Sequence, residues 1–593
     1  MATRFILGDN NWGIQEDFVL GYAINPENNF YIPREVSFTR SSDGMAVLSD
    51  GSIRRFPWNF IQNSESLDNA SWIKTNVVVV PNSEIAPNGT LTADLVIPTT
   101  GMGEHNLNPI GIPLFPVTEP ETISFYAKSG GLNFIGIRTN INSSWVVTQF
   151  NLSTNAVASL GAGMSNPLIT SVGNGWYRCV VTVSNRTANA FQFIASPAGS
   201  VSFTSDGKNG VYLWGCQLVD GSDPLVYLRT GSRADFPRID SSFGNKCLLF
   251  EISKINLDPV SKNFNNAAWT LTNSGGVTVS TVTASNPFNL PTVSKIIPTT
   301  TLGQHRPFAT LNYSAAGRMW VIAKADGYNF LSLGESGSVS GGDIIFNLSN
   351  GTVSGSAPGY TPEILSLGNG WYKCSLNVLA TGSLGRFIIV RNANSTADYS
   401  GDGTSGILIA HKQYEVGTFD SSPIVSTSGS ATRNSDYAFI SNATQYIGNS
   451  EGTIFLHTSN VKANASGNWL VRLDDGTENN RLGLFCAASS GNLMVNISRT
   501  GTGSDIMVYS DFLTLTNQGN AKIALAYKNG DFALAVNGTI VATSNNAGAI
   551  PAFTTIRFNS NSSNGLIGDF SLRKFQLEDL RLSNAELIQL TTL

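Results

Sequence analysis

Hydrophobic and polar residues alternate one by one along many short segments of this chain. The clearest alternating segments are residues 123–128, 134–138, 177–183 and 211–214. Successive side chains of a β-strand point to opposite faces of the sheet, so this period predicts strands with one face in a core. Turn-forming residues such as Gly173-Asn174-Gly175 separate the segments, which is typical of antiparallel connections. The pattern therefore predicts an all-β fold of antiparallel, jelly-roll-like β-sandwiches.

A long internal repeat is the second regularity. The motif LDNASW at 67–72 returns as FNNAAW at 264–269, and GNGWYRC at 173–179 returns as GNGWYKC at 368–374. The order of the motifs is the same in both copies, and the shift between them stays within 195–200 residues. These matches indicate the tandem duplication of one module.

Domain boundaries follow from the repeat and from changes in composition. A Ser/Thr/Gly-rich join at 426–430 precedes a region that does not match the repeat. Near the end of that region, Ser583 and Glu586 have the spacing of a capping box, which predicts a short terminal helix. The predicted division is an extended N-terminal arm at 1–55, a β-sandwich module at 56–232 (module 1), a connector with a second module at 233–428 (module 2), and a C-terminal sandwich at 429–593.

Charge limits the classes of partner. Only 13% of the residues are charged, the formal net charge is −5, and Lys and Arg form no cluster. Such a chain lacks an electrostatic footprint for nucleic acid or an anionic membrane, so neither partner is expected. The N-terminus lacks the basic and apolar regions of a signal peptide, and no long apolar stretch occurs, so membrane insertion is not expected. Five scattered cysteines without a CxxC pair indicate reduced thiols.

Motifs of standard active sites do not occur in the sequence. It contains no HExxH, no GxSxG and no P-loop, and it has only four histidines. A non-enzymatic protein without a cofactor is therefore predicted. One alternative is a polysaccharide depolymerase, which would need a pair of carboxylates in a groove. Another alternative is a structural spacer that binds no ligand.

Acidic residues supply the candidate ligand-binding and metal-binding positions. The densest acidic stretch contains Asp474, Asp475 and Glu478, which could bind a glycan or, through their oxygens, Ca²⁺. A solvated hairpin tip is the alternative for these three residues. Asp206 and Asp402 occupy the same turn in the two copies and could also bind Ca²⁺, although an Asp-Gly turn alone explains them.

Three pairs of ring side chains are matched between the two copies. These are Trp72 with Trp269, Trp176 with Trp371, and His105 with His305. The tryptophans could stack on sugar rings, because an aromatic face buries the apolar side of a pyranose, or they could pack in the core. The histidines could be ligands or hydrogen-bonded structural residues.

The repeated motifs resemble those of a known family. LDNASW, SFYAK at 124–128, FNLS at 150–153, GNGWY and YLWGCQL at 212–218 resemble a sugar-binding-module-like sandwich found in tandem in bacteriophage head-fibre and tail-fibre proteins. Residues 434–593, with their terminal LSxAEL motif, resemble the laminin-G or concanavalin A-like lectin sandwich that often closes such proteins. Module 2 departs from the pattern, because Ala410-His411-Lys412 stands where module 1 has Trp214-Gly215-Cys216.

The resemblance implies a structural virion protein, a fibre or decoration protein on the phage head or tail that binds host-surface or environmental glycans. It also implies a location on the virion surface and a homotrimer, although no coiled-coil heptads are present. The arm is expected to attach to other virion proteins, because its apolar side chains need a partner surface. The expected anchor residues are Phe5, Leu7, Trp12, Phe18, Tyr22, Phe30 and Tyr31.

Overall fold

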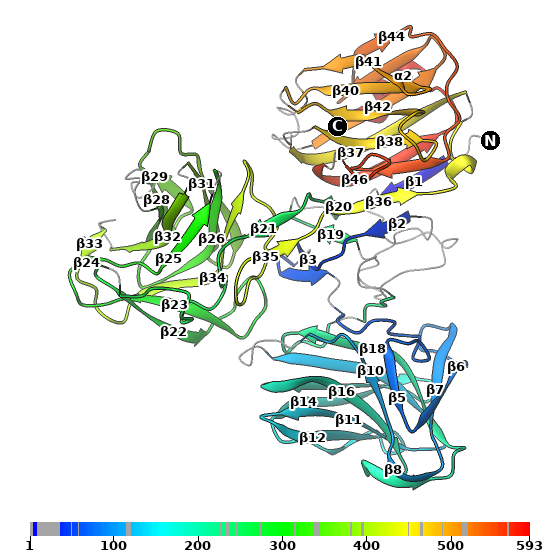
Figure 1. Cartoon of the computed structure of the whole chain (residues 1–593), viewed down its shortest axis with the longest axis vertical. Coiled ribbons are helices and arrows are strands. Elements are labelled where there is room, and N and C mark those ends of the chain that lie inside the picture. Colours follow the sequence, from blue (N-terminus) through cyan, green and yellow to red (C-terminus); the bar gives the residue numbers. More distant parts are fainter. Residues whose placement is uncertain are drawn as a thin grey trace. The chain divides into compact units, whose positions relative to one another are not determined.

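The computed structural model describes most of the chain. It describes residues 4–8, 36–48, 50–56, 59–113, 120–225, 227–231, 237–242, 246–272, 274–313, 316–335, 344–379, 382–392, 397–448, 450–462, 467–488, 490–510, 512, 520–565 and 568–592. These residues form antiparallel β-sheets with very little helix, which confirms the all-β prediction (Figure 1). Within them, no helix is long and apolar enough to cross a membrane.

Module 1 is built from two six-stranded β-sheets and a two-stranded sheet of β8 and β17. Its strands are β5 (Trp72–Thr75), β6 (Val77–Ile85), β7 (Leu91–Pro98), β8 (Gly101–Glu104), β9 (Asn106–Pro109), β10 (Glu121–Gly130), β11 (Phe134–Ile141), β12 (Ser144–Asn151), β13 (Ala156–Ser159), β14 (Met164–Gly173), β15 (Trp176–Val183), β16 (Arg186–Ser196), β17 (Ser202–Ser205) and β18 (Gly210–Asp220). One sheet has the order β14-β15-β10-β18-β7-β6 and the other β13-β12-β11-β16-β9-β5. Their inner faces share one core, in which Phe125, Ile137 and Phe193 are buried.

Module 2 repeats this arrangement. Its strands are β22 (Val277–Thr283), β23 (Thr292–Pro298), β24 (Gly303–Gln304), β25 (Phe308–Tyr313), β26 (Gly317–Asp326), β27 (Phe330–Glu335), β28 (Ile345–Asn347), β29 (Thr352–Ser354), β30 (Pro362–Gly368), β31 (Trp371–Val378), β32 (Gly382–Arg391), β33 (Asp398–Tyr399) and β34 (Gly406–Val416). The sheet orders are β22-β23-β34-β26-β31-β30 and β25-β32-β27-β28-β29. The order of the matched strands is therefore the same in both modules.

Matched residues of the two modules also make matched contacts. Asn59 accepts a hydrogen bond from the backbone of Leu218 in module 1, and Asn256 accepts one from Tyr414 in module 2. The next buried positions differ in chemistry. Where module 1 places Ile61 and Cys216, module 2 places Asp258 and Lys412, whose Oδ1 and Nζ atoms lie 2.7 Å apart with both side chains fully buried. The same fold is thus built around an apolar contact in one copy and an ion pair in the other.

This contrast yields a stability prediction. We expect Lys412→Met alone to lower the free energy of unfolding by about 3–5 kcal/mol, because it leaves the buried Asp258 carboxylate unpaired. The double variant Asp258→Leu with Lys412→Met should recover the wild-type value or exceed it, since module 1 folds with apolar residues at both positions. Thermal and denaturant unfolding of the full chain measure both effects. A double variant as unstable as the single one would contradict this account.

The C-terminal sandwich has larger sheets. Its strands are β37 (Glu451–Lys462), β38 (Asn468–Asp474), β39 (Arg481–Cys486), β40 (Leu493–Arg499), β41 (Thr502–Tyr509), β42 (Asn520–Lys528), β43 (Phe532–Val536), β44 (Thr539–Ser544), β45 (Thr555–Phe558) and β46 (Asp569–Glu578). The helix α2 (Asn584–Thr591) begins after Ser583, whose side chain accepts from the backbone of Glu586 while the Glu586 carboxylate accepts from the backbone of Ser583. The predicted capping box is confirmed. Leu587 of this helix packs on the alanine-rich outer face of β42 and β43.

Strand β36 (Tyr437–Ile440) and four strands from outside this region complete its two sheets. The four outside strands are β1 (Arg4–Gly8), β2 (Val36–Thr39), β19 (Arg238–Asp240) and β20 (Cys247–Phe250). The resulting orders are β19-β20-β46-β37-β42-β43-β44, with β1 also paired to β46, and β2-β36-β45-β38-β39-β40-β41. A further pair joins β21 (Lys254–Asn256) to β35 (Ala431–Arg433). Segments far apart in the sequence therefore share hydrogen-bonded sheets.

A buried ion cluster joins the same segments. Arg238 is paired with Asp436 and with Glu251, and the Arg238 Nη1 to Glu251 Oε2 distance is 2.5 Å. Arg40 pairs with Asp436 at 2.7 Å, and Arg433 pairs with Glu251 at 2.5 Å. Burial alone would raise the pKa of Glu251, but Arg433 and Arg238 hold it well below its usual value. Three connecting segments thus each contribute one arginine to a shared pair of carboxylates.

The described part of the predicted N-terminal arm does not stand apart. Strand β2 pairs with β36, and the hairpin of β3 (Gly44–Val47) and β4 (Ile53–Phe56) places Met45 and Ile53 against Trp320 of module 2. One compact unit contains the described residues of 4–8, 35–55 and 237–593, and the other contains those of 56–236. The described residues of 36–55 therefore pack within the same unit as module 2 and the C-terminal sandwich, because strands this short are stable only when their backbone groups are paired.

Asp569, at the start of β46, gives a pH prediction. Its Oδ1 accepts from the backbone of Ile252 at 3.1 Å, while burial, reinforced by Glu251, raises the pKa of Asp569 to about 7. The unfolded chain ionises this carboxyl near pH ~4, so its ionisation destabilises the fold progressively as the pH rises from about 4 to 7. Asp569→Asn should therefore be more stable than wild type. The difference in free energy of unfolding should grow across that interval by at most about 1.4 kcal/mol per pH unit, and it should stay constant at higher pH.

Urea unfolding of both proteins at several pH values tests this expectation. A stability difference that does not change with pH would show that Asp569 titrates normally.

Candidate functional site

A polar row crosses the outer face of the second sheet of module 1. In sheet order from β12 to β5, this outer row contains Val147, Arg138, Gln192, Asn108 and Ile73. Neighbouring strands lie about 4.8 Å apart, so five strands give the row a length of about 19 Å. The residues on either side of it in sequence, such as Ile137 and Leu107, point inward and are buried in the core. Period-2 alternation therefore places the row on the face opposite to the core.

Trp145 lies beside one end of this row. It stands two residues before Val147 on β12, and 45% of its surface is exposed. The turn that positions it contains Asn142 and Ser143, both with positive φ, which brings β12 back directly against β11. The Arg138 guanidinium carbon lies 4.7 Å from the Trp145 ring centroid. This cation–π contact holds an exposed indole in a fixed place.

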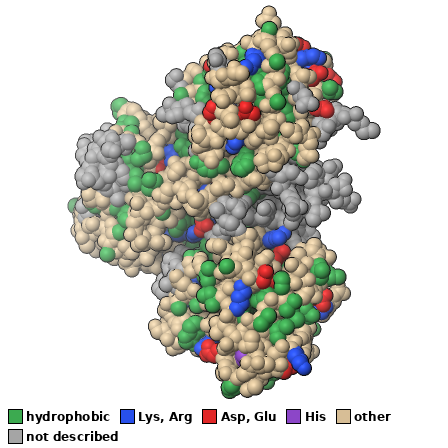
Figure 2. Space-filling view, turned by 45° about the vertical axis from the view of Figure 1, so that its right-hand side comes forward, with side chains coloured by type: hydrophobic (Ala, Val, Ile, Leu, Met, Phe, Trp, Pro, Cys, Tyr) green, Lys and Arg blue, Asp and Glu red, His purple; other side chains and the backbone are tan. Residues whose placement is uncertain are grey.

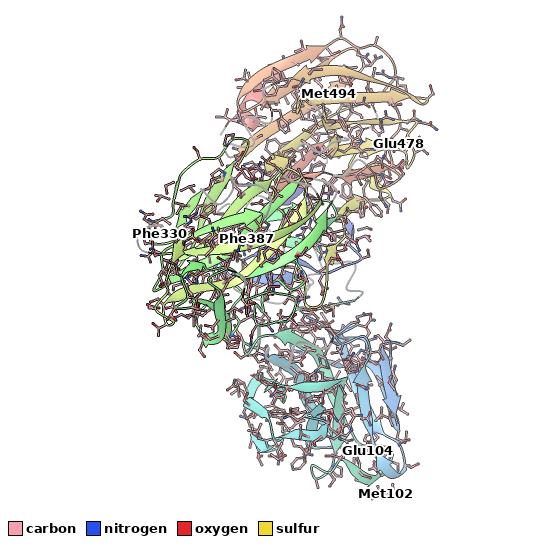
Figure 3. The ribbon with its side chains drawn as sticks, turned by 60° about the vertical axis from the view of Figure 1, so that its left-hand side comes forward. Met102, Glu104, Phe330, Phe387, Glu478 and Met494 are labelled. Carbon is pink, nitrogen blue, oxygen red and sulfur yellow. The ribbon has the colours of Figure 1, made fainter. Side chains whose placement is uncertain are left out.

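Arg138 is itself held by polar partners. Its Nη1 donates to Oε2 of Glu104 at 2.9 Å and to Oε1 of Gln192 at 3.3 Å. Glu104 is the last residue of β8, is labelled in Figure 3, and is 49% exposed on its side chain. The guanidinium is therefore fixed between a carboxylate, an amide and an aromatic ring.

These groups have the chemistry that sugar recognition needs. The exposed indole offers a flat apolar surface for a pyranose ring. The carboxylate of Glu104, the amide of Gln192 and the guanidinium of Arg138 together offer donors and acceptors to hydroxyl groups. On the side of the molecule shown in Figure 2, charged side chains are scattered among a larger number of uncharged groups.

Module 2 carries a different set of residues at the matched positions. Gly334 pairs with Phe387 where module 1 pairs Arg138 with Gln192. Phe387 stacks on Phe308 with ring centroids 6.2 Å apart, and the Arg306 guanidinium carbon lies 4.4 Å from the Phe387 centroid. A Cβ at Gly334 would overlap the Phe387 ring, so glycine lets the ring lie across the sheet. Phe387, labelled in Figure 3, is only 5% exposed, and this stack is closed.

The predicted acidic residues of the C-terminal sandwich accept hydrogen bonds from other residues of the chain. Asp474 is fully buried and accepts from Nε of Arg472 at 2.8 Å and from Nε of Arg557 at 3.0 Å. Glu478 accepts from Nη1 of Arg472 at 2.8 Å, and although burial alone would raise its pKa, the hydrogen bonds from Arg472 and Ser562 lower the pKa of Glu478 to about 2. Asp475 accepts from the backbone and hydroxyl of Thr477 and from the Asn480 amide. Oxygens of all three carboxylates thus accept hydrogen bonds from other residues of the C-terminal sandwich.

Asp206 and Asp402 cap their own turns. Asp206 accepts from the backbone N–H groups of residues 208 and 209, and Asp402 accepts from those of residues 404 and 405. Hydrogen bonds from Ser405 and Thr404 lower the pKa of Asp402 to about 2. Turn capping accounts for both aspartates. Among the residues that the structure describes, no three His, Cys, Asp or Glu side chains are grouped closely enough to hold a metal ion.

The matched tryptophans and histidines are buried. Trp72 and Trp269 pack in the cores between the sheets, whereas Trp176 and Trp371 pack in clusters on the outer faces of the six-stranded sheets. All four tryptophans are at most 3% exposed, and each indole N–H donates to a backbone carbonyl. His105 lies between the carbonyls of Asn76 and Phe203, and His305 lies between those of Gly276 and Tyr399. These contacts favour packing for the four tryptophans and a hydrogen-bonded structural role for the two histidines.

The expected anchor residues fall mostly outside the described chain. Phe5 and Leu7 lie in β1, whose backbone pairs with β46. The other five, which are Trp12, Phe18, Tyr22, Phe30 and Tyr31, lie outside the described residues.

The sequence prediction did not identify Trp145, Arg138 or Glu104. A signal for two of them exists, since Arg138 and Trp145 flank the turn at Asn142 and Ser143, and Trp145 stands two residues before Val147, the residue that pairs with Arg138. In a tight hairpin, residues placed in this way lie near each other on one face.

Comparisons with known proteins give only distant similarities. No protein-family model and no curated protein matches the chain. Among solved structures, the CBM40 of Ruminococcus gnavus IT-sialidase bound to alpha2,3 sialyllactose is 18% identical, covers 25% of this chain and 84% of its own, and has a TM-score of 0.21. The CBM22-1-CBM22-2 tandem domain of Paenibacillus barcinonensis Xyn10C is 11% identical, covers 64% of this chain and 100% of its own, and has a TM-score of 0.19.

A third similar structure is the LG1-3 region of the laminin alpha2 chain. It is 9% identical, covers 82% of this chain and 97% of its own, and has a TM-score of 0.13. Similarities this low do not assign a function, so the functional argument rests on the outer row itself.

Proposed function

We propose that this chain is a non-catalytic glycan-binding protein displayed on a bacteriophage particle as a fibre or decoration protein. The observation that carries the binding proposal is the exposed Trp145 ring held 4.7 Å from the Arg138 guanidinium, beside the outer row that contains Gln192. Support for the virion role comes from the sequence motifs that resemble those of phage head-fibre and tail-fibre modules. The proposed ligands are glycans of the host surface or of the environment.

An open sheet face gives weak contacts with a single glycan, because an exposed row buries little of its ligand. Display of several copies on one particle would raise the overall affinity through effective concentration. A homotrimer would present three outer rows and would fit this proposal. Because this gain in affinity needs several copies on one particle, attachment to the particle is part of the proposed function.

The first test of binding is Trp145→Ala. We expect its affinity for the glycans that the wild-type chain retains on an oligosaccharide array to fall about tenfold or more, which corresponds to about 1.4 kcal/mol. Leu168→Ala is the matched control, since Leu168 is 53% exposed on β14 of the other sheet and should leave binding unchanged. Equal binding by both variants would place the glycan elsewhere.

The second test concerns attachment to the particle. Because β1, β2 and Arg40 pair with the C-terminal sandwich, the proposed anchor is restricted to residues 9–34. A deletion variant in which a Gly/Ser segment of equal length replaces residues 9–34 should keep the wild-type circular dichroism spectrum, and it should be absent from purified particles by immunoblot. Trp145→Ala should be incorporated normally. Full incorporation of the deletion variant would move the anchor to another part of the chain.

A further inference from the structure

We infer that the outer row of module 1 selects uncharged glycans and that Glu104 sets this selectivity. The inference rests on the proposed glycan-binding function and names the class of ligand. Of Trp145 and the five residues of the row, only Arg138 carries a charge. Glu104 lies 2.9 Å from its Nη1 and cancels that charge.

This pairing disfavours an anionic ligand for two reasons. A ligand carboxylate that approached Arg138 would also approach the half-exposed carboxylate of Glu104, and like charges repel. In addition, Nη1 of Arg138 already donates to Glu104 and Gln192. A guanidinium has five N–H donors, so others remain for neutral hydroxyl groups. The Gln192 amide likewise suits hydroxyl groups, because an amide carries both a donor and an acceptor.

Module 2 shows that the fold does not require the carboxylate. Gly103-Glu104 of β8 pairs with β17 in module 1, and Gly303-Gln304 of β24 pairs with β33 in the same way in module 2. Gln304 accepts from Nη1 of Arg306 at 3.1 Å, so a glutamine at this position can also hold an arginine. Glu104→Gln therefore introduces the residue that the repeat already uses, and Glu104 is a specificity-determining residue rather than a structural one.

The experiment compares wild type, Glu104→Gln and the control Glu84→Gln. Glu84 pairs with Lys128 at 3.1 Å on the other sheet of module 1, so its loss removes an equivalent surface ion pair away from the row. The probe is an array on which each neutral oligosaccharide stands beside its uronic-acid or sialylated counterpart. Wild type should bind the neutral member of each pair, with an affinity that changes less than about twofold when the salt concentration rises from low to about 0.5 M.

Glu104→Gln should gain at least about tenfold in affinity for the acidic members, and high salt should abolish this gain, because Arg138 is then uncompensated. Glu84→Gln should behave as wild type. If wild type prefers the acidic members, or if Glu104→Gln leaves the preference unchanged, the inference is wrong while the proposed function stands. If wild type retains no glycan at all, both are overturned. If Trp145→Ala binds as wild type does, the ligand lies off the row and the inference is also wrong.

Discussion

Arg238 has no exposed side-chain surface, so its guanidinium must find all of its partners inside the protein. A buried charge without a partner lowers the free energy of unfolding by about 3–5 kcal/mol, so Arg238 requires acidic neighbours. Asp436 and Glu251 pair with it, and they bring Arg40 and Arg433 into the same cluster. Because Arg40 follows β2 directly, the cluster commits residues 36–56 to the protein's own interior. The anchor that we propose must therefore lie outside these residues.

The alternation of side chains along a strand leaves each sandwich with two outer faces, and the duplicated modules use these faces differently. In module 2 the outer face of the six-stranded sheet is covered by Met45 and Ile53, and the other sheet carries the closed Phe308–Phe387 stack. In module 1 the matching six-stranded sheet packs its outer tryptophans against residues of the same module, such as Tyr227. The outer row on its other sheet stays open beside Trp145. Divergence after duplication thus explains why the binding proposal concerns module 1.

Much of the fold follows from local sequence, because alternation, turn residues and capping motifs act over a few residues. The strands of both modules, their matched core tryptophans and the capping box of Ser583 and Glu586 are of this kind. The position of residues 36–56 could not be predicted in this way, since the Arg40 to Asp436 ion pair joins positions 396 residues apart. The surroundings of Asp474 could not be predicted from local sequence either, because Arg557, which pairs with Asp474, lies 83 residues away.

The candidate site was missed for a related reason. Alternation predicts that Arg138 and the core residue Ile137 face opposite sides, but it does not tell which outer faces other segments cover. That information comes only from tertiary packing, as the covered sheet of module 2 shows.

The central claim is that a glycan binds across the outer row of module 1. The most direct measurement is a crystal structure of the full chain soaked with the neutral oligosaccharide that it retains most strongly on the array. Our account predicts a sugar ring stacked on Trp145, with hydroxyl groups bonded to Arg138 and Gln192. Sugar density at the loop of Asp474 and Glu478, or on the Phe308–Phe387 stack, with the outer row empty, would contradict it.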